Sequence, residues 1–352
     1  MLINIKTIIE KLYLENNASE EELLFLLTNL DTESKEYLFQ KAYEIRLKTY
    51  GNSVFLRGLI EISSFCKSNC MYCGLRVDNK NAQRYRLSKE EIIECCETGY
   101  SLGFRTFVMQ GGEDAYYSDE LLVSVIKEIK LKFPDAAVTL SLGERSEDSY
   151  KKLYDAGADR YLLRHETANK EIYDSVHPGM SFENRRECLK ILKKIGFQTG
   201  AGFLVGLPNQ TNKDFVKDLL FIKELEPEMV GIGPFIPQKN TPLSHIPNGN
   251  VDTVLIMLAL VRLLLPNVLL PATTALGTLD PMGREKGFRV GANVIMPNLS
   301  PFENRAKYAL YDGKVFTNDE AAEELKKIKK KISDAGFEAI MTRGDNVLWK
   351  RK

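Results

Sequence analysis

The feature that most constrains the fold is an alternation that runs from residue 54 to residue 296, in which short apolar runs are separated by longer stretches of helical periodicity. Eight runs predict strands, at Val54–Ile62, Thr106–Met109, Ala136–Leu142, Asp159–Arg164, Gln198–Val205, Met229–Phe235, Val268–Thr273 and Ala292–Met296. Strands that alternate with crossover helices pair in parallel, because short right-handed connections return the chain to the same end of the sheet. Eight such units predict an α/β fold, a closed (β/α)8 TIM barrel.

Helical segments are expected on both sides of this barrel. Ser19 and Glu22 form a capping-box pattern before an apolar run, and Gly51 is a suitable helix end. We expect an N-terminal helical extension at residues 1–51 and the barrel at residues 52–312. A C-terminal helical segment at residues 313–352, with a helix over 318–335, is expected to pack on the barrel. A chain of 352 residues suits one barrel of about 250 residues with extensions.

Charge and composition exclude several classes of protein. The 48 basic and 48 acidic side chains give a formal charge of zero, which argues against a general nucleic-acid or anionic-membrane binder. No apolar run reaches the roughly 18–20 residues that span a bilayer, and the first residues lack a secretory pattern. Six cysteines in this length argue against a disulfide framework. We therefore expect a cytoplasmic protein with neither nucleic-acid nor membrane partners.

Three of the cysteines form a compact metal-binding pattern. Cys66, Cys70 and Cys73 follow the first predicted strand with C-x3-C-x2-C spacing. Three thiolates on one short loop can bind three irons of a 4Fe–4S cluster and leave the fourth iron open to a small molecule. Structural zinc would need a fourth ligand, and the nearest cysteines, Cys95 and Cys96, lie in an amphipathic segment. Zinc binding and a plain structural role stay as the alternatives.

Polar residues at two strand ends indicate a ligand site at the mouth of the barrel, where barrel enzymes place their chemistry. The second strand ends in Gln110-Gly111-Gly112-Glu113-Asp114, whose glycines allow close backbone approach to a ligand but also suit a tight turn. The fourth strand ends in Arg164-His165-Glu166-Thr167. Glu166 can bond ribose hydroxyls and Arg164 can hold a carboxylate, unless the two form a structural ion pair. Arg185 would add a second clamp, although alone it resembles surface charge.

Other polar residues carry weaker signals. Arg57 lies inside an apolar strand and needs an anionic partner there, while Thr273 and Thr274 at the seventh strand end can bond a polar substrate. His177 and His245 lie in loops flanked by proline and are expected at the surface. His165 is expected to be an orienting or core histidine rather than a metal ligand.

The motif Cys66-x3-Cys70-x-Tyr72-Cys73 on an eight-unit barrel resembles the radical S-adenosylmethionine (SAM) superfamily. Longer stretches, among them Asp159–Asn169 and Met229–Pro237, resemble the biotin-synthase-like group and, within it, the maturases of iron–iron hydrogenase. The resemblance covers about residues 50 to 312. It implies a transferase-type radical enzyme with two cofactors, a 4Fe–4S cluster and SAM.

The resemblance also assigns residues to roles. The cluster would be held by Cys66, Cys70 and Cys73, and a second cluster is not expected because no cysteine follows Cys188. SAM would be bound by Tyr72, Gly111, Gly112, Glu113, Arg164, Glu166, Arg185 and Met229. The substrate cavity would be lined by Arg57, Gln110, Thr139, Thr273, Thr274 and Tyr308.

The activity implied by the resemblance is reductive cleavage of SAM to a 5′-deoxyadenosyl radical, with an electron from a ferredoxin- or flavodoxin-like donor. The radical would act in the barrel lumen on a small iron–carbonyl–cyanide substrate, a cysteine-bound Fe(CO)2(CN) precursor, in hydrogenase H-cluster maturation. Other hydrogenase maturases would be its partners. The alternatives are another biotin-synthase-like enzyme, either a mutase or a sulfur-insertion enzyme, and a non-enzymatic iron–sulfur scaffold or electron carrier.

Overall fold

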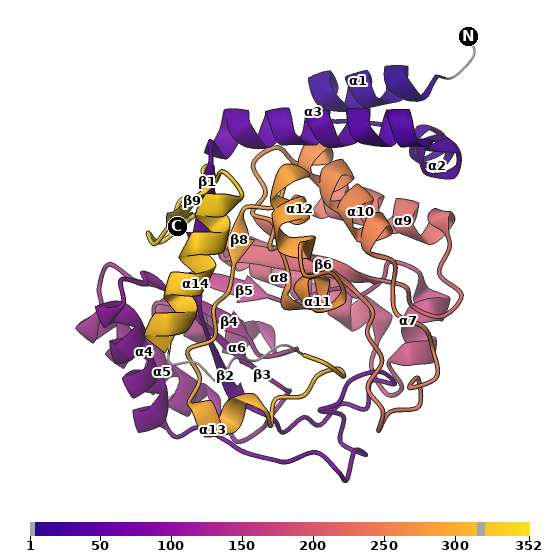
Figure 1. Cartoon of the computed structure of the whole chain (residues 1–352). Coiled ribbons are helices and arrows are strands. Elements are labelled where there is room, and N and C mark those ends of the chain that lie inside the picture. The colour runs from indigo at the N-terminus through magenta and orange to yellow at the C-terminus, as the bar shows by residue number, and fades with distance from the viewer. Residues whose placement is uncertain (1–3, 315–320) are drawn as a thin grey trace.

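The computed structural model describes residues 4–314 and 321–352 and begins with three helices. They are α1 (Ile5–Glu15), α2 (Glu20–Asn29) and α3 (Thr32–Tyr50), which lie together along one side of the molecule (Figure 1). Ser19 and Glu22 form the predicted capping box of α2, and α3 ends at Gly51, whose φ of 57° suits glycine. The helical part of the N-terminal prediction is confirmed, while the domain boundaries stay a prediction.

The strands form two parallel sheets that continue one another around a barrel. The larger sheet runs in chain order through β2 (Gly58–Ser63), β3 (Thr106–Gly111), β4 (Ala137–Ser141), β5 (Arg160–Leu162), β6 (Gln198–Val205) and β7 (Met229–Pro234). The smaller has the order β8 (Val294–Ile295), β1 (Ser53–Leu56) and β9 (Glu338–Ile340). Single bridges at Met229–Leu269, Pro271–Val294 and Leu59–Asn298 connect the sheets. The predicted parallel α/β barrel is confirmed.

Three details of the barrel differ from the prediction. The first predicted strand is divided at Arg57, because β1 pairs with β8 and β9 whereas β2 pairs with β3. The predicted strand Val268–Thr273 is present only as bridges, and Pro271 lacks the N–H that a regular ladder needs. The C-terminal segment adds β9, which was not predicted.

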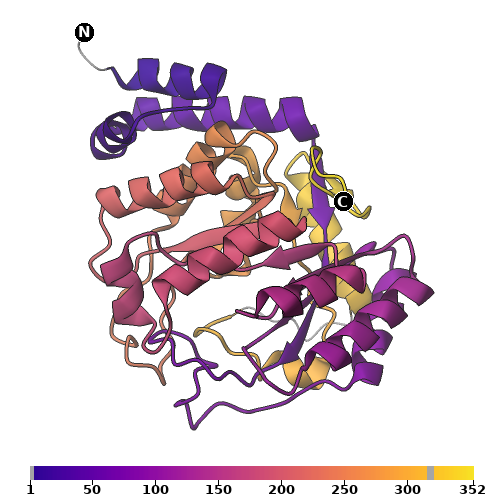
Figure 2. The same cartoon turned by 180° about the vertical axis from the view of Figure 1, so that it is seen from behind.

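Helices cover the outside of the barrel (Figures 1 and 2). They are α4 (Lys89–Ser101), α5 (Asp119–Lys132), α6 (Glu147–Asp155), α7 (Lys170–Val176), α8 (Phe182–Ile195), α9 (Asn212–Leu225), α10 (Val251–Leu264), α11 (Thr274–Leu279), α12 (Gly283–Arg289), α13 (Phe302–Arg305) and α14 (Ala321–Asp334). Every residue of β2 and β6 is buried, as expected for parallel strands that are covered on both faces. Within the described part of the chain, none of the helices is both long and apolar enough to span a membrane. Of the helix predicted over 318–335, the part before residue 321 lies outside the described residues.

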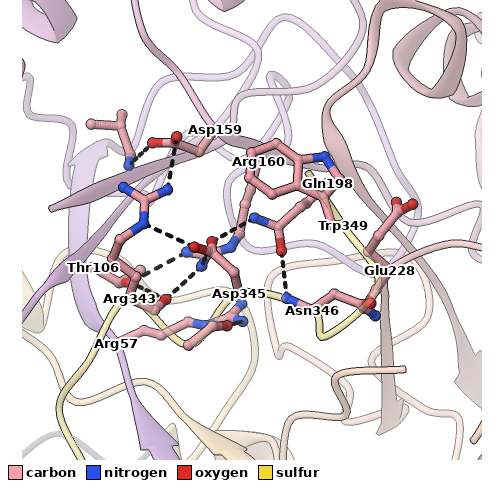
Figure 3. Close-up of polar contacts among 12 residues, drawn as sticks. Arg57, Thr106, Asp159, Arg160, Gln198, Glu228, Arg343, Asp345, Asn346 and Trp349 are labelled. Carbon is pink, nitrogen blue, oxygen red and sulfur yellow. Dashed lines mark hydrogen bonds and ion pairs between the residues drawn. The ribbon is translucent and has the colours of Figure 1, made fainter. Parts of the chain in front are cut away.

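The chain beyond β9 closes the amino ends of the strands, which we call the floor of the barrel. Asp345 accepts hydrogen bonds from Arg160 and Gln198, both at 2.6 Å, and from Arg343 at 2.8 Å (Figure 3). Arg343 also pairs with Asp159 at 3.0 Å. These contacts fill the floor with protein, so the open end available for chemistry is the opposite one, the mouth formed by the carboxyl ends of the strands.

Candidate functional site

The cysteine loop lies at the mouth, directly after β2. Cys66, Cys70 and Cys73 are free and half-buried, and the backbone N–H of Lys67 donates to the carbonyl of Glu113 at 2.9 Å. This joins the loop to the end of β3.

Gly112 allows the cysteine loop to pack closely against the end of β3. A Cβ atom placed on Gly112 would lie 2.1 Å from the carbonyl oxygen of Phe65 and 2.7 Å from Cβ of Cys66, which no side chain allows. The glycine predicted to admit a close neighbour therefore admits the cysteine loop itself.

The loop thiols lie in a common, poorly solvated environment. Burial, with a smaller contribution from the neighbouring thiols, raises the pKa of Cys70 and raises that of Cys73 to about 12. Because burial disfavours a lone thiolate, a bound metal centre is the natural source of compensating charge. Cys95 and Cys96 lie on α4, as their amphipathic pattern predicted, and both are buried in the hydrophobic core.

The donor set fits an iron–sulfur cluster in type and number, with three free thiols on one loop. Among residues 4–314 and 321–352, no three His, Cys, Asp or Glu side chains are gathered tightly enough to hold a single metal ion.

Four predicted charged residues meet beside the cysteine loop. The side chain of Arg164 pairs with Glu166 at 3.2 Å, and Arg185 lies 3.8 Å from Glu113. Arg185 also donates to the backbone carbonyl of Arg164 at 3.1 Å. The Glu166 atom that faces Arg164 is Oε2, which is buried and makes no hydrogen bond among the described residues. The site thus contains two guanidinium groups and two carboxylates, with acceptor capacity left over.

Glu144 belongs to the same cluster and was not predicted. It accepts from Nε of Arg185 at 2.6 Å and from Asn184 at 2.5 Å, and its backbone N–H donates to Glu113 at 3.2 Å. Burial opposes the charge of Arg185, but Tyr173, Glu144, Glu113 and Glu166 together raise its pKa above the ordinary value. The run Gly143-Glu144 after β4 resembles Gly112-Glu113 after β3, and that likeness was the signal that could have identified it.

Tyr72, between two of the cysteines, is held by a histidine. Its hydroxyl lies 2.9 Å from Nε2 of His177, and its ring also contacts Phe235 edge-on. The prediction that His177 lies at the surface is wrong, because His177 follows the last residue of α7 and turns inward until only 2% is exposed. Burial lowers the pKa of His177 to about 3, so the ring is neutral.

The residues predicted to line a substrate cavity are partly brought together. Gln110 donates to the hydroxyl of Tyr308 at 3.3 Å, and Tyr308 is buried. Thr139 is fully buried on β4, with no hydrogen-bond partner for its hydroxyl among the described residues. Thr273 caps α11, and Thr274 accepts from Arg284 at 3.2 Å, so both threonines have structural partners.

Two predicted site residues lie at the floor instead. Arg57 donates to the carbonyl of Gly344 at 3.2 Å and contacts the sulfur of Met229 at 2.9 Å. Met229 is the first residue of β7 and packs with Tyr50 and Leu269. Met229 therefore contacts Arg57 at the start of β7, whereas it was predicted to bind SAM together with the charged residues that follow the ends of β3 and β5.

The chain is similar to known proteins over the segments that carry this site. The sequence profile of the radical SAM superfamily matches residues 60–222, which include the cysteine loop and the strand ends that carry the charged cluster. The chain is 50% identical over 318 residues to the [FeFe] hydrogenase maturase subunit HydE of Thermotoga maritima, with 90% of each chain covered. It is 30% identical over 331 residues to the 3-methylornithine synthase of Methanosarcina acetivorans, with 94% of this chain and 92% of the relative covered.

Solved structures show the same architecture. The crystal structure of methylornithine synthase, PylB, superposes with a TM-score of 0.82 at 26% identity, covering 95% of this chain and 97% of that one. The structure of HydG, a maturase of the [FeFe]-hydrogenase, superposes with a TM-score of 0.81 at 22% identity, covering 96% and 76%. At 22% identity, the similarity to HydG shows a shared fold and nothing more.

Proposed function

The chain belongs to the HydE family of radical SAM enzymes, and from this membership we propose that Cys66, Cys70 and Cys73 hold one 4Fe–4S cluster through three ligands. The family implies the cluster and SAM as cofactors. Three free thiols on one loop at the barrel mouth support this ligand set. Held by these three thiolates, the cluster would keep one iron open for SAM.

The charged cluster beside the loop is the proposed SAM site. The guanidinium of Arg185, fixed by Glu144, suits the carboxylate of SAM, because a planar fork matches a carboxylate. Gly111, Gly112 and Glu113 would face the amino group. Oε2 of Glu166 pairs with Arg164 but makes no hydrogen bond, so Glu166 would accept from the ribose hydroxyls. Tyr72, fixed by His177, would lie beside the adenine. Arg164 completes this set.

When bound, the cluster and SAM would supply a 5′-deoxyadenosyl radical, with methionine as the other product of the reductive cleavage of SAM. The protein's contribution is orientation and the exclusion of water. Tyr72, Tyr308 and Phe235 are buried or half-buried around the mouth. In the proposed function, these side chains would surround the reacting atoms and keep water away from a radical.

Hydrogenase maturation is the reaction that we propose, and the 50% identity to HydE is the observation that carries it. The substrate would be a small cysteine-bound Fe(CO)2(CN) complex in the lumen, where Gln110, Thr139 and Tyr308 offer neutral hydrogen-bonding groups. The electron donor would be a ferredoxin or flavodoxin, and the other hydrogenase maturases would be partners. The mutase alternative is supported by the 30% identity to 3-methylornithine synthase.

The test has two parts. Anaerobically reconstituted protein with SAM and a chemical reductant should release 5′-deoxyadenosine, and its absence would leave only the scaffold or electron-carrier function. The second part incubates an immature hydrogenase with the other maturases. The hydrogenase should become active only when this chain is added, and the Cys70→Ala variant should not activate it. An isomerised amino acid or a sulfur-containing product would identify the mutase or the sulfur-insertion alternative.

A further inference from the structure

Glu166 has an unusual backbone conformation. Its φ is +65°, in the left-handed region that disfavours any residue with a Cβ atom. The backbone is held on both sides, because the N–H of Glu166 donates to the carbonyl of Gly202 at 3.0 Å and its own carbonyl accepts from Leu204 at 3.0 Å. A strained conformation persists only where its surroundings determine it, and strain of this kind is concentrated at functional sites. The question is which groups maintain it.

His165, the preceding residue, is fixed behind the strand ends. Its ring is 1% exposed and lies against Phe221 and Phe203, with centroid distances of 4.8 and 5.9 Å. Nδ1 accepts from the backbone N–H of Gly202 at 3.3 Å. In the neutral ring the proton therefore lies on Nε2, which donates to Oδ1 of Asp218 at 3.2 Å.

Asp218 connects this ring to α9. It is 0% exposed, and the same Oδ1 also accepts from the backbone N–H of Ala168 at 2.5 Å. One turn earlier on the helix, Asp214 accepts from the side chain of Asn169 at 2.6 Å. Two carboxylates at i and i+4 on one face of α9 thus hold the loop over 165–169 on both sides of Glu166.

We propose that Asp218, acting through His165, is a positioning residue that holds Glu166 in its left-handed conformation and so aims the Glu166 carboxylate at SAM. This inference rests on the proposed function, in which Glu166 binds the ribose. Neither Asp218 nor His165 is among the residues assigned to SAM or to the substrate. A purely structural role would stabilise the fold and leave the affinity for SAM unchanged.

The experiment measures SAM binding to the cluster-reconstituted, unreduced protein by calorimetry, together with thermal unfolding. We expect Glu166→Ala and Asp218→Ala each to raise the Kd for SAM about tenfold, which corresponds to one hydrogen bond to a charged group. The double variant should be no weaker than Glu166→Ala alone, because Asp218 would act only through Glu166. His165→Phe keeps the ring volume but loses both polar contacts, so it should match Asp218→Ala.

Asp159→Ala is the matched control. Asp159 is also a buried aspartate, but it lies at the floor, where it accepts from the backbone N–H of Val138 at 2.9 Å and pairs with Arg343. This change should lower the unfolding temperature without changing the Kd for SAM. Asp218→Asn keeps an acceptor oxygen in place and should restore most of the affinity that Asp218→Ala loses.

The outcomes separate this inference from the proposed function. If Glu166→Ala weakens SAM binding while Asp218→Ala and His165→Phe do not, the inference is overturned and the SAM site stands. If the losses in the double variant add, Asp218 acts by another route and the inference is also overturned. If Glu166→Ala binds SAM as tightly as the wild type, both the ribose role of Glu166 and the positioning role fall together.

Discussion

The two ends of the barrel use the same side chains for different purposes. At the floor, Asp345 accepts from Arg160, Gln198 and Arg343 at 2.6 to 2.8 Å, and the C-terminal tail covers the group. At the mouth, Glu144 holds Arg185 at 2.6 Å, but Arg185 and Glu113 are 3.8 Å apart, and Oε2 of Glu166 faces Arg164 at 3.2 Å without a hydrogen bond among the described residues. The floor is arranged for stability, whereas the mouth holds its charges ready for a ligand.

The physical reason is the cost of burying charge. A buried ion is tolerated only when partners replace its lost hydration, so the floor binds nearly every polar atom of Asp345 to protein. At the mouth, a charged ligand can supply part of that compensation, and Arg164 keeps 37% of its side chain exposed. Changes at the mouth should therefore affect activity more than stability, and changes at the floor should do the reverse.

The largest effect is expected at the mouth. Cys70→Ala should lower SAM cleavage at least about a hundredfold and remove the visible absorbance of the cluster, because one of three metal ligands is lost. The stability of the cluster-free protein should change by no more than about 1 kcal/mol, since Cys70 is only half-buried. Cys95→Ala is the control, and this variant should keep both cluster and activity. Normal iron content in Cys70→Ala would contradict the ligand assignment.

The next effect belongs to the floor. Asp345→Ala should destabilise the protein by about 3–5 kcal/mol in urea unfolding, because it leaves the buried guanidinium of Arg160 without its carboxylate. The Kd for SAM should not change. Asp155, which forms an exposed ion pair with Lys151, is the control, and Asp155→Ala should cost less than about 1 kcal/mol. A loss of SAM affinity in Asp345→Ala would show that the two ends are coupled.

A smaller effect depends on pH and tests whether His177, at the mouth, is shielded from water. The pKa of His177 is lowered to about 3 by burial, so between that value and about 6.5 the unfolded chain binds a proton that the folded chain does not. Stability should therefore fall as the pH drops from 7.5 to 5, with about 2 kcal/mol due to this residue. Urea unfolding of the cluster-free protein at both pH values measures this difference. His177→Gln should lack that part of the loss, and an unchanged pH dependence would mean that His177 is hydrated.

The smallest effect is expected in α2, away from both ends of the barrel, where a loss of stability should leave SAM binding unchanged. Ser19→Ala removes the capping box of α2 and should cost about 1 kcal/mol of stability with no change in SAM binding. Thermal unfolding and calorimetry of the same preparation measure both quantities. A change in the Kd for SAM here would mean that binding follows global stability, and the contrast between mouth and floor would lose its basis.

Much of the fold was predictable because its signals are local. Strand positions followed from apolar runs, and the cap of α2 followed from Ser19 and Glu22, three residues apart. The floor was not predictable, because Arg160 and Asp345 are 185 residues apart in the chain. His177 was placed wrongly for a related reason, since a proline beside it suggested a surface loop although Tyr72, from a distant segment, covers it.

What the sequence by itself determined was the chemistry that the chain could support. Three thiols within eight residues and a regular alternation of apolar runs are properties of neighbouring residues, so they survive any uncertainty about long-range contacts. Only the tertiary structure decided which charges meet, for example that Glu144 holds Arg185 and that Asp218 lies behind Glu166. These pairs form because closing the barrel brings the ends of different strands and helices together, and no local pattern encodes that geometry.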